Sequence, residues 1–394
     1  MDKELREAVE GIKKRYADGL VNAGDDSRIV KCMRRALAGE KLTIAFLGGS
    51  ITQGSLASEP KNCYAYRTYH WWEQSFPQSE ISYWNAGIGA TTSHLGVARV
   101  QEEVLSQQPD FVIVEFSVND EDFSLHFEET YESLVRVILA APWKPALLLV
   151  HNVRYDDGGN AELLHRPVGE RYHVPCVSMK PVLYAKIAEG GLEARSITPD
   201  NLHPNDLGHE LVAGVITTYL EQPKQKAIAL GAKKDAGGPT DFEDSFLPLP
   251  VPLTRSSYEN LMRYRNYQIT PTLCSGFVQD DAPQYSISDC FKRGWTASEK
   301  GAKIVFRVAG PNIAVQYRKT VRKPAPVARL ILDGDRSEAI TLDANFEQEW
   351  GDCIYLETVL EHGGEGEHTV EIEIVEASEE DKECFYLVSI LARA

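Results

Sequence analysis

Four short apolar runs in the first half of this 394-residue chain constrain its fold more than any other feature. Each has the length of a buried strand, and helical patterns over residues 63–76, 94–107 and 127–140 separate them. The runs are LTIAFL (42–47), ISYWNAG (81–87), DFVIVEFS (110–117) and PALLLVHNV (145–153). Strands that alternate with helices indicate βαβ units. Residues 1–223, with N-terminal helices over 1–40, are therefore predicted to form an α/β domain with a doubly wound parallel sheet.

The pattern changes after residue 223. Residues 224–257 are rich in Lys, Gly, Pro and Asp, which is typical of a linker or of a segment that wraps a surface. Residues 258–394 contain short, mostly alternating or β-branched runs between Gly, Pro and Asp turns, which predict an all-β sandwich or jelly roll. These runs cover residues 303–308, 313–318, 328–334, 354–360, 368–375 and 384–392.

Composition excludes several functional classes. The chain has 41 Lys and Arg against 58 Asp and Glu, a net charge of −17, which argues against binding nucleic acid or an anionic membrane. No apolar run approaches the roughly 18 residues that span a bilayer. The charged N-terminus does not read as a signal peptide, and the seven Cys form no CxxC pair. We expect a cytoplasmic protein with reduced thiols and no metal site.

A serine follows the first predicted strand at Gly48-Gly49-Ser50-Ile51-Thr52. The active site of a doubly wound sheet lies at the carboxyl ends of its strands, so Ser50 stands where a nucleophile would be expected. Taken alone, the segment is explained better by a serine that caps a helix than by a nucleophile. A phosphate-binding P-loop is excluded because Gly54 is followed by Ser-Leu, and the GxSxG elbow because position 52 is Thr. His209-Glu210 lacks the second His of a zinc-protease motif.

Three further polar segments follow the strands. A Gly-rich turn, Asn85 to Ser93, can present backbone N–H groups to an oxyanion, and the Asn119 side-chain amide can donate to one. Near the end of the domain, Asp200 precedes His203 by three residues, close enough to orient its imidazole as a general base. Ordinary turn and capping roles explain each segment separately.

The order of these blocks resembles the SGNH (GDSL-type) hydrolase superfamily over about residues 40–220. The resemblance implies a nucleophile at Ser50, a general base at His203 and an orienting acid at Asp200. It also implies oxyanion donors at the Ser50 amide, the second-block amide and the Asn119 side chain. Two positions depart from the usual pattern. Gly49 replaces the usual Asp, and the donating glycine aligns with Ala90, so both Gly89 and Ala90 are candidate donors.

A closer resemblance is to bacterial carbohydrate acetylesterases that pair this domain with a β-sandwich, especially carbohydrate esterase family 17. It is carried by LVNAGDDSRIVKCMRRALAGE before GGSITQGS and by NAGIGATTSHLGVARV. It implies a serine esterase that removes O-acetyl groups from plant-glycan oligosaccharides (acetylated mannan or xylan) without a cofactor. An SGNH lipase or thioesterase and a non-catalytic glycan-binding protein remain alternatives, and a homo-oligomer stays open.

The C-terminal domain resembles carbohydrate-binding jelly rolls. Trp350, in an acidic loop, is the candidate for stacking on a sugar ring, whereas Trp295 directly precedes a strand and is expected to be a core or interdomain residue. A second role as a lid over the active site is also open. The aromatic residues that follow Ser50 are expected mainly to pack a helix; they are Tyr64, Tyr66, Tyr69, Trp71 and Trp72.

Overall fold

The computed structural model describes residues 3–231 and 249–393. The chain divides into two compact units, residues 1–256 and 257–394. Each unit has its own sheets and its own hydrophobic core, and each is described by itself below.

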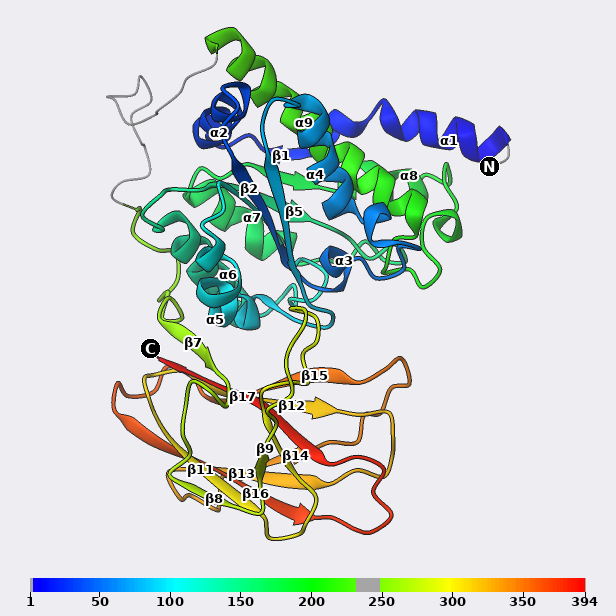
Figure 1. The fold of residues 1–394 in the computed structure, drawn as a ribbon. Coiled ribbons are helices and arrows are strands. Elements are labelled where there is room, and N and C mark those ends of the chain that lie inside the picture. Colours follow the sequence, from blue (N-terminus) through cyan, green and yellow to red (C-terminus); the bar gives the residue numbers. More distant parts are fainter. Residues whose placement is uncertain (1–2, 232–248, 394) are drawn as a thin grey trace. The chain divides into compact units, whose positions relative to one another are not determined.

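The first unit alternates helices with the strands of one sheet (Figure 1). Its strands are β1 (Leu20–Asn22), β2 (Leu42–Gly48), β3 (Ile81–Gly87), β4 (Phe111–Glu115), β5 (Ala146–His151) and β6 (Cys176–Ser178). Its helices are α1 (Lys3–Lys13), α2 (Ser27–Leu37), α3 (Ser50–Gln53), α4 (Tyr64–Ser75), α5 (Ser93–Glu103), α6 (Leu125–Leu139), α7 (Glu162–Arg171), α8 (Ala185–Ala188) and α9 (Asp206–Leu230). The four predicted strands and three predicted helices are all present.

The strand order is β1-β6-β5-β4-β2-β3, and only the short β1 runs antiparallel to its neighbour. Strand β2 lies between β4 and β3, and Gly48 at its end pairs with Gly87 on one side and Glu115 on the other. The loops that follow these three strands therefore leave the sheet side by side. They carry three of the four blocks identified in the sequence.

Helices cover both faces of this sheet. Helices α2, α4 and α9 pack together on one face, and α5, α6 and α7 form a second group (Figure 1). Along β2, Ile44 and Phe46 join the core cluster of the first helix group, while Ala45 and Leu47 on the opposite face are equally buried. Burial on both faces explains why this strand is a continuous apolar run instead of an alternating one.

The second unit consists of two antiparallel sheets. One has the order β15-β12-β17-β10-β9, with β7 also paired to β17, and the other has the order β14-β13-β16-β11-β8. The strands are β7 (Leu261–Tyr264), β8 (Leu273–Ser275), β9 (Val278–Gln279), β10 (Trp295–Ala297), β11 (Lys303–Ala309), β12 (Ile313–Lys319), β13 (Val327–Leu332), β14 (Ile340–Asp343), β15 (Cys353–Leu360), β16 (Glu367–Glu376) and β17 (Phe385–Arg393).

The core of the second unit lies between its two sheets. Trp295 on β10 is fully buried there and contacts Phe306 on β11 edge-to-face, with the ring centroids 5.0 Å apart. Of the two expected roles for Trp295, a core or an interdomain residue, the structure shows the first. The predicted fold class, a parallel α/β domain followed by an antiparallel β domain, is confirmed as well.

The predicted linker begins too early. Helix α9 runs through Pro223 to Leu230, so residues 224–230 are helical, and the part of the linker at 232–248 lies outside the described residues. Proline interrupts a helix only where packing does not compensate for the lost hydrogen bond. Here Pro223 and Ala227 are buried, and the Lys224 ammonium lies 4.9 Å from the centre of the Trp71 ring. Residues 249–256 belong to the first unit, where the Thr254 backbone N–H donates to Glu132 at 2.8 Å.

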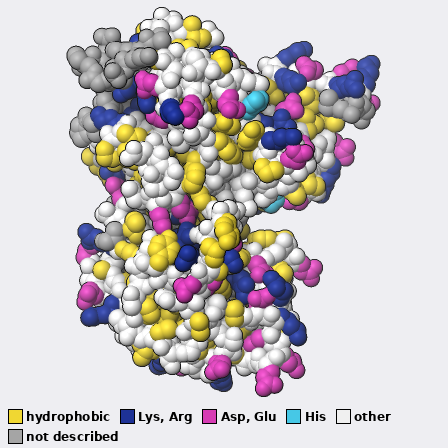
Figure 2. All heavy atoms as spheres, in the orientation of Figure 1, with side chains coloured by type: hydrophobic (Ala, Val, Ile, Leu, Met, Phe, Trp, Pro, Cys, Tyr) yellow, Lys and Arg dark blue, Asp and Glu magenta, His cyan; other side chains and the backbone are white. Residues whose placement is uncertain are grey.

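Acidic and basic side chains intermingle on the face that Figure 2 displays. Within residues 3–231 and 249–393, none of the helices has both the length and the apolar character needed to cross a membrane. All seven cysteines are free thiols.

Candidate active site

Ser50 is the first residue of α3, directly after the end of β2. The backbone N–H of a first helical residue has no partner inside the helix, so it is free to donate elsewhere. Gly48 makes this close approach of strand and helix possible, because a Cβ there would overlap the Thr52 hydroxyl and the Glu115 carbonyl. The Thr52 hydroxyl is in turn held by the Tyr64 hydroxyl at 2.8 Å. The serine therefore stands on a short turn with little freedom to move.

Ser50, His203 and Asp200 form one chain of hydrogen bonds. The Ser50 Oγ lies 2.8 Å from His203 Nε2, and His203 Nδ1 lies 2.7 Å from Asp200 Oδ2. A carboxylate can only accept, so Nδ1 carries the proton and donates it to Asp200. Nε2 is then an acceptor, oriented to take the proton of the Ser50 hydroxyl. This is the arrangement of a nucleophile, a general base and an orienting acid.

Asp200 is stabilised as a carboxylate. Burial alone raises its pKa, but hydrogen bonds from the His203 ring and from the backbone N–H groups of His203 and Leu202 outweigh burial, and the net shift is downward. The two backbone donors lie 2.8 and 2.9 Å from Oδ1, which leaves Oδ2 for the imidazole. The negative charge at Oδ2 favours an imidazolium at His203 when it accepts a proton.

The second block places Gly89 and Ala90 beside the serine. A Cβ added to Gly89 would lie 3.8 Å from the Ser50 Cβ. The Gly89 N–H donates to Gln53 Oε1 at 2.6 Å, whereas the Ala90 N–H has no acceptor among the described residues. Ala90 has a φ of 56°, so it adopts the left-handed conformation that glycine adopts more readily. Of the two candidate donors, Gly89 and Ala90, it is therefore Ala90 whose N–H is free.

Asn119 follows β4 and lies against Gly49. Its carbonyl oxygen is buried without a hydrogen-bond donor, and its amide nitrogen has no acceptor in the part of the chain that the structure describes. A Cβ at position 49 would overlap this carbonyl oxygen. The glycine that replaces the usual aspartate thus leaves room for the Asn119 side chain, whose N–H groups are free to donate to a ligand.

Comparison with known proteins gives the same family. Residues 46–211 match the GDSL-like Lipase/Acylhydrolase family. Two crystal structures of a two-domain esterase (CEX) active on acetylated mannans, one of them co-crystallized with mannopentaose, are 50% identical in sequence to this chain. The matches cover 96% of this chain and 98% of those chains, with TM-scores of 0.90 and 0.89. The chain belongs to the GDSL-like acylhydrolase family. The comparison with curated proteins found no match.

The acylhydrolase structure brings together all of the predicted site residues in the first unit and adds one that the sequence did not single out. The exposed Gln53 lies one helical turn beyond Ser50 and bonds the second block. The sequence shows that Gln53 lies three residues after Ser50, but it does not show that Gln53 contacts the loop that contains Gly89. Trp350 lies in the second unit, 58% exposed, with its ring edge-to-face on Phe346 at 5.0 Å.

His209 holds the segment that follows α3 through two hydrogen bonds. Its Nδ1 accepts from the Tyr64 backbone N–H at 3.3 Å, and its Nε2 donates to the Ser55 carbonyl at 3.2 Å. Burial lowers the pKa of His209 to about 4, so the ring is neutral and both nitrogens are used. Among the described residues, no group of three potential ligands (His, Cys, Asp or Glu) could hold a metal ion.

Glu115 is a buried carboxyl at the end of β4, beside the turn that carries Ser50. Burial raises its pKa to about 7, although hydrogen bonds from Ser117 oppose the shift. Ser117 donates to Glu115 Oε1 from its backbone N–H at 3.0 Å and from its hydroxyl at 2.8 Å. The folded protein therefore binds the Glu115 proton more tightly than the unfolded chain does, because the pKa of this carboxyl is near 4.5 in the unfolded chain.

We expect this proton to make the stability of the enzyme depend on pH. The contribution of Glu115 is full below pH 4.5 and is lost as the pH rises to about 7, amounting to about 3 kcal/mol. Glu115→Gln cannot ionise, so the variant should gain stability relative to wild type between pH 5 and pH 8. Urea denaturation at both pH values measures this, with the exposed Glu299→Gln as control. A wild-type-to-variant difference that is equal at both pH values would contradict it.

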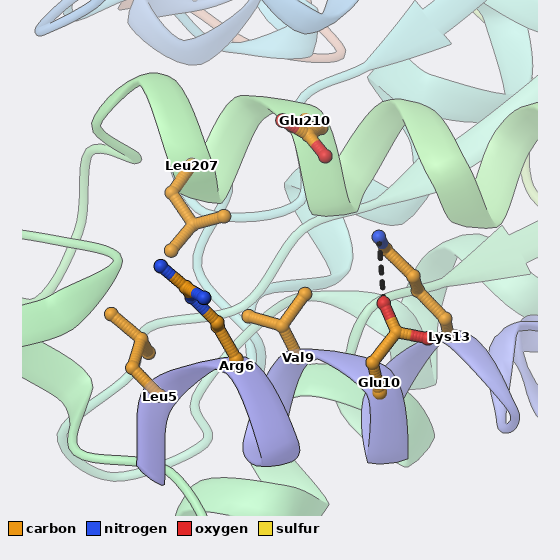
Figure 3. Close-up of a pocket in the computed structure, with 7 residues that line it drawn as sticks. All are labelled: Leu5, Arg6, Val9, Glu10, Lys13, Leu207 and Glu210. Carbon is orange, nitrogen blue, oxygen red and sulfur yellow. Dashed lines mark hydrogen bonds and ion pairs between the residues drawn. The ribbon is translucent and has the colours of Figure 1, made fainter. Parts of the chain in front are cut away.

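One surface pocket lies between α1 and the first turns of α9 (Figure 3). Leu5, Val9 and Leu207 line it together with charged side chains, and Lys13 bonds Glu10 at 3.1 Å on its rim. None of the predicted site residues lines this pocket.

Proposed function

We propose that this protein is a serine esterase that removes acetyl groups from acetylated mannan oligosaccharides. The observation that carries the proposal is the hydrogen-bonded chain from Ser50 through His203 to Asp200. It stands in a protein that is 50% identical, over both of its units, to an esterase active on acetylated mannans.

The reaction follows from this geometry. His203 Nε2 takes the proton of the Ser50 hydroxyl as Oγ attacks the acetyl carbonyl carbon. The tetrahedral intermediate collapses, the imidazolium gives its proton to the sugar oxygen, and the deacetylated sugar leaves. Water, deprotonated by the same imidazole, then attacks the acetyl-serine, and acetate departs while Ser50 regains its proton. Asp200 stabilises the imidazolium in both halves of the cycle.

We assign three donors to the oxyanion of the tetrahedral intermediate. They are the backbone N–H of Ser50 at the start of α3, the free N–H of Ala90 and the side-chain amide of Asn119. Neither of the latter two has an acceptor among the described residues, so no existing hydrogen bond must break before they bind the oxyanion. Preorganised donors of this kind stabilise the transition state more than the substrate.

Asn119→Ala is expected to lower kcat about 100- to 1,000-fold with little change in KM, since an oxyanion donor acts mainly in the transition state. Initial rates on p-nitrophenyl acetate separate the two constants. Asn345→Ala, in the second unit, is the control. An effect confined to KM would exclude Asn119 as an oxyanion donor.

The substrate is tested by proton NMR of acetate release from acetylated manno- and xylo-oligosaccharides. Loss of specific acetyl signals from the mannan oligosaccharides supports the proposal. Hydrolysis of p-nitrophenyl acetate without release of acetate from either glycan would keep the serine esterase and reject the glycan substrate.

Trp350 is proposed to contact the sugar chain from the second unit. Its ring is largely exposed, and Phe346 meets it at an interplanar angle of 89°, which fixes one ring edge-to-face against the other. Trp350→Ala should raise KM for acetylated oligosaccharides severalfold and leave hydrolysis of p-nitrophenyl acetate unchanged. Tyr285→Ala, another exposed aromatic residue of this unit, is the control. If Trp350→Ala and wild type have equal KM values for the oligosaccharide, Trp350 does not bind the sugar chain.

A further inference from the structure

The N-terminus of helix α5 is not capped by the side chain of its own N-cap residue. Thr92 occupies the N-cap position, but its side chain makes no capping hydrogen bond. Instead the Ser93 backbone N–H donates at 2.9 Å to Oδ1 of Asp120, a residue that follows a different strand. Ser93 is fully buried and Asp120 is 5% exposed, so this bond is shielded from water.

The same carboxylate is held on its other side by a histidine. His165 Nε2, on α7, lies 2.9 Å from Asp120 Oδ2, and both side chains have no exposed surface. The His165 ring stacks on Tyr131 of α6, with 3.6 Å between centroids and 3° between planes. The imidazole cannot turn without breaking this stack, so it fixes Asp120 in one orientation.

Asp120 thus connects the two loops that carry oxyanion donors. It is covalently next to Asn119, and both backbone N–H groups donate to the Phe116 carbonyl at 3.0 Å. Through Ser93 it also holds the end of the loop that contains Ala90, three residues away along the chain. A buried charge-assisted hydrogen bond between two loops restricts their separation more than a contact at the surface would.

We propose that Asp120, oriented by His165, is a positioning residue that sets the distance between the Ala90 N–H and the Asn119 amide. The inference rests on the proposed function, because it assigns these two groups to the oxyanion. A displacement of about 1 Å at such a site costs up to about 100-fold in rate. Among the hydrogen bonds of the described residues, none joins Asp120 or His165 to Ser50 or His203.

Asp120→Ala is expected to lower kcat on p-nitrophenyl acetate about 10- to 100-fold, per active site titrated, with KM unchanged. Asp120→Asn should restore kcat to within a fewfold of wild type, because its amide oxygen can still accept from the Ser93 N–H. His165→Phe keeps the stack on Tyr131 but removes the hydrogen bond, and should lower kcat severalfold. Combining Asp120→Ala with Asn119→Ala should cost less than the product of the two separate losses.

Asp110→Asn is the matched control. Asp110 directly precedes β4, at the other end of this strand from Asp120, and its carboxylate accepts from the Thr43 backbone N–H at 2.8 Å and from the Arg35 guanidinium. Its loss should lower stability and leave kcat unchanged. Asp120→Ala with wild-type kcat and reduced stability would show a merely structural role and overturn the proposal. A double-variant loss equal to the product would overturn it too.

A second pair of variants serves where Asp120→Ala does not fold. Ser93→Pro removes the donating N–H at the first helical position, where proline is well accepted. Thr92 is already extended, with φ of −107° and ψ of 174°, as a residue before proline requires. Ser93→Ala removes only the hydroxyl, which bonds Thr130 at 2.7 Å. The proline variant alone should lower kcat, and equal kcat in both would overturn the proposal.

These outcomes differ from failure of the proposed function. If wild type does not hydrolyse p-nitrophenyl acetate, or if Ser50→Ala hydrolyses it equally well, the serine esterase assignment itself falls. If wild type is active and depends on Ser50 while the Asp120 and Ser93 variants keep its kcat, only the positioning role falls.

Discussion

Ser50→Ala should abolish nearly all acetate release, lowering kcat by about 10⁴- to 10⁶-fold. The Ser50 hydroxyl is the nucleophile that forms the acetyl-enzyme in the proposed mechanism, and its Oγ lies 2.8 Å from the base, His203 Nε2. Alanine removes one atom from a buried position and leaves the α3 turn and its backbone N–H in place. The fold and the oxyanion donors should therefore survive the change.

The measurement is acetate release by proton NMR, together with the thermal unfolding midpoint of each variant. Ser106→Ala, an exposed serine that bonds only within its own neighbourhood, is the control and should match wild type in both. Turnover by Ser50→Ala within tenfold of wild type would refute the nucleophile. A collapse of the unfolding midpoint would mean that the loss of activity reports on folding instead.

Much of the fold was predictable because burial dictates the sequence pattern. Strand β2 is apolar at every position from Ile44 to Leu47 because helices cover both of its faces. Strands β11 and β16 alternate because one face of their sheet is solvated. The course of α9 beyond Pro223 was not predictable, since contacts with Trp71 and with residues far away in sequence maintain a helix that local signals end.

The residues of the candidate site also fall into those that the sequence could predict and those that it could not. Ser50, Asn119, Asp200 and His203 could be proposed because each follows a recognisable strand or lies in a short local motif. The choice between Gly89 and Ala90 could not be made, because it depends on Gln53, the last residue of α3, which accepts the hydrogen bond of the Gly89 N–H. The role of Asp120 could not be predicted for a similar reason, because its partners Ser93 and His165 lie 27 and 45 residues away in the sequence.

Asp200→Asn should lower kcat by about 10⁴-fold, although it changes neither size nor shape. Asp200 Oδ1 accepts two backbone N–H groups, from Leu202 and His203, so the amide oxygen of asparagine must occupy that position. The NH₂ group then faces His203 Nδ1, which has to become an acceptor. The ring proton moves to Nε2, where it faces the Ser50 hydroxyl, and the imidazole can no longer act as a base.

A second Asp–His pair provides the control for this tautomer effect. In the second unit, Asp333 Oδ2 lies 2.7 Å from His368 Nδ1, and its Oδ1 accepts the Thr369 backbone N–H at 2.7 Å. Asp333→Asn imposes the same change on an imidazole that has no serine partner among the described residues, and should leave kcat unchanged. The kcat of each variant on p-nitrophenyl acetate, measured across pH, decides the matter. If Asp200→Asn keeps kcat within tenfold of wild type, Asp200 does not control the protonation of His203. If Asp333→Asn loses activity as severely, the effect of the Asp200 change cannot be assigned to the tautomer, because the same substitution acts without a nucleophile.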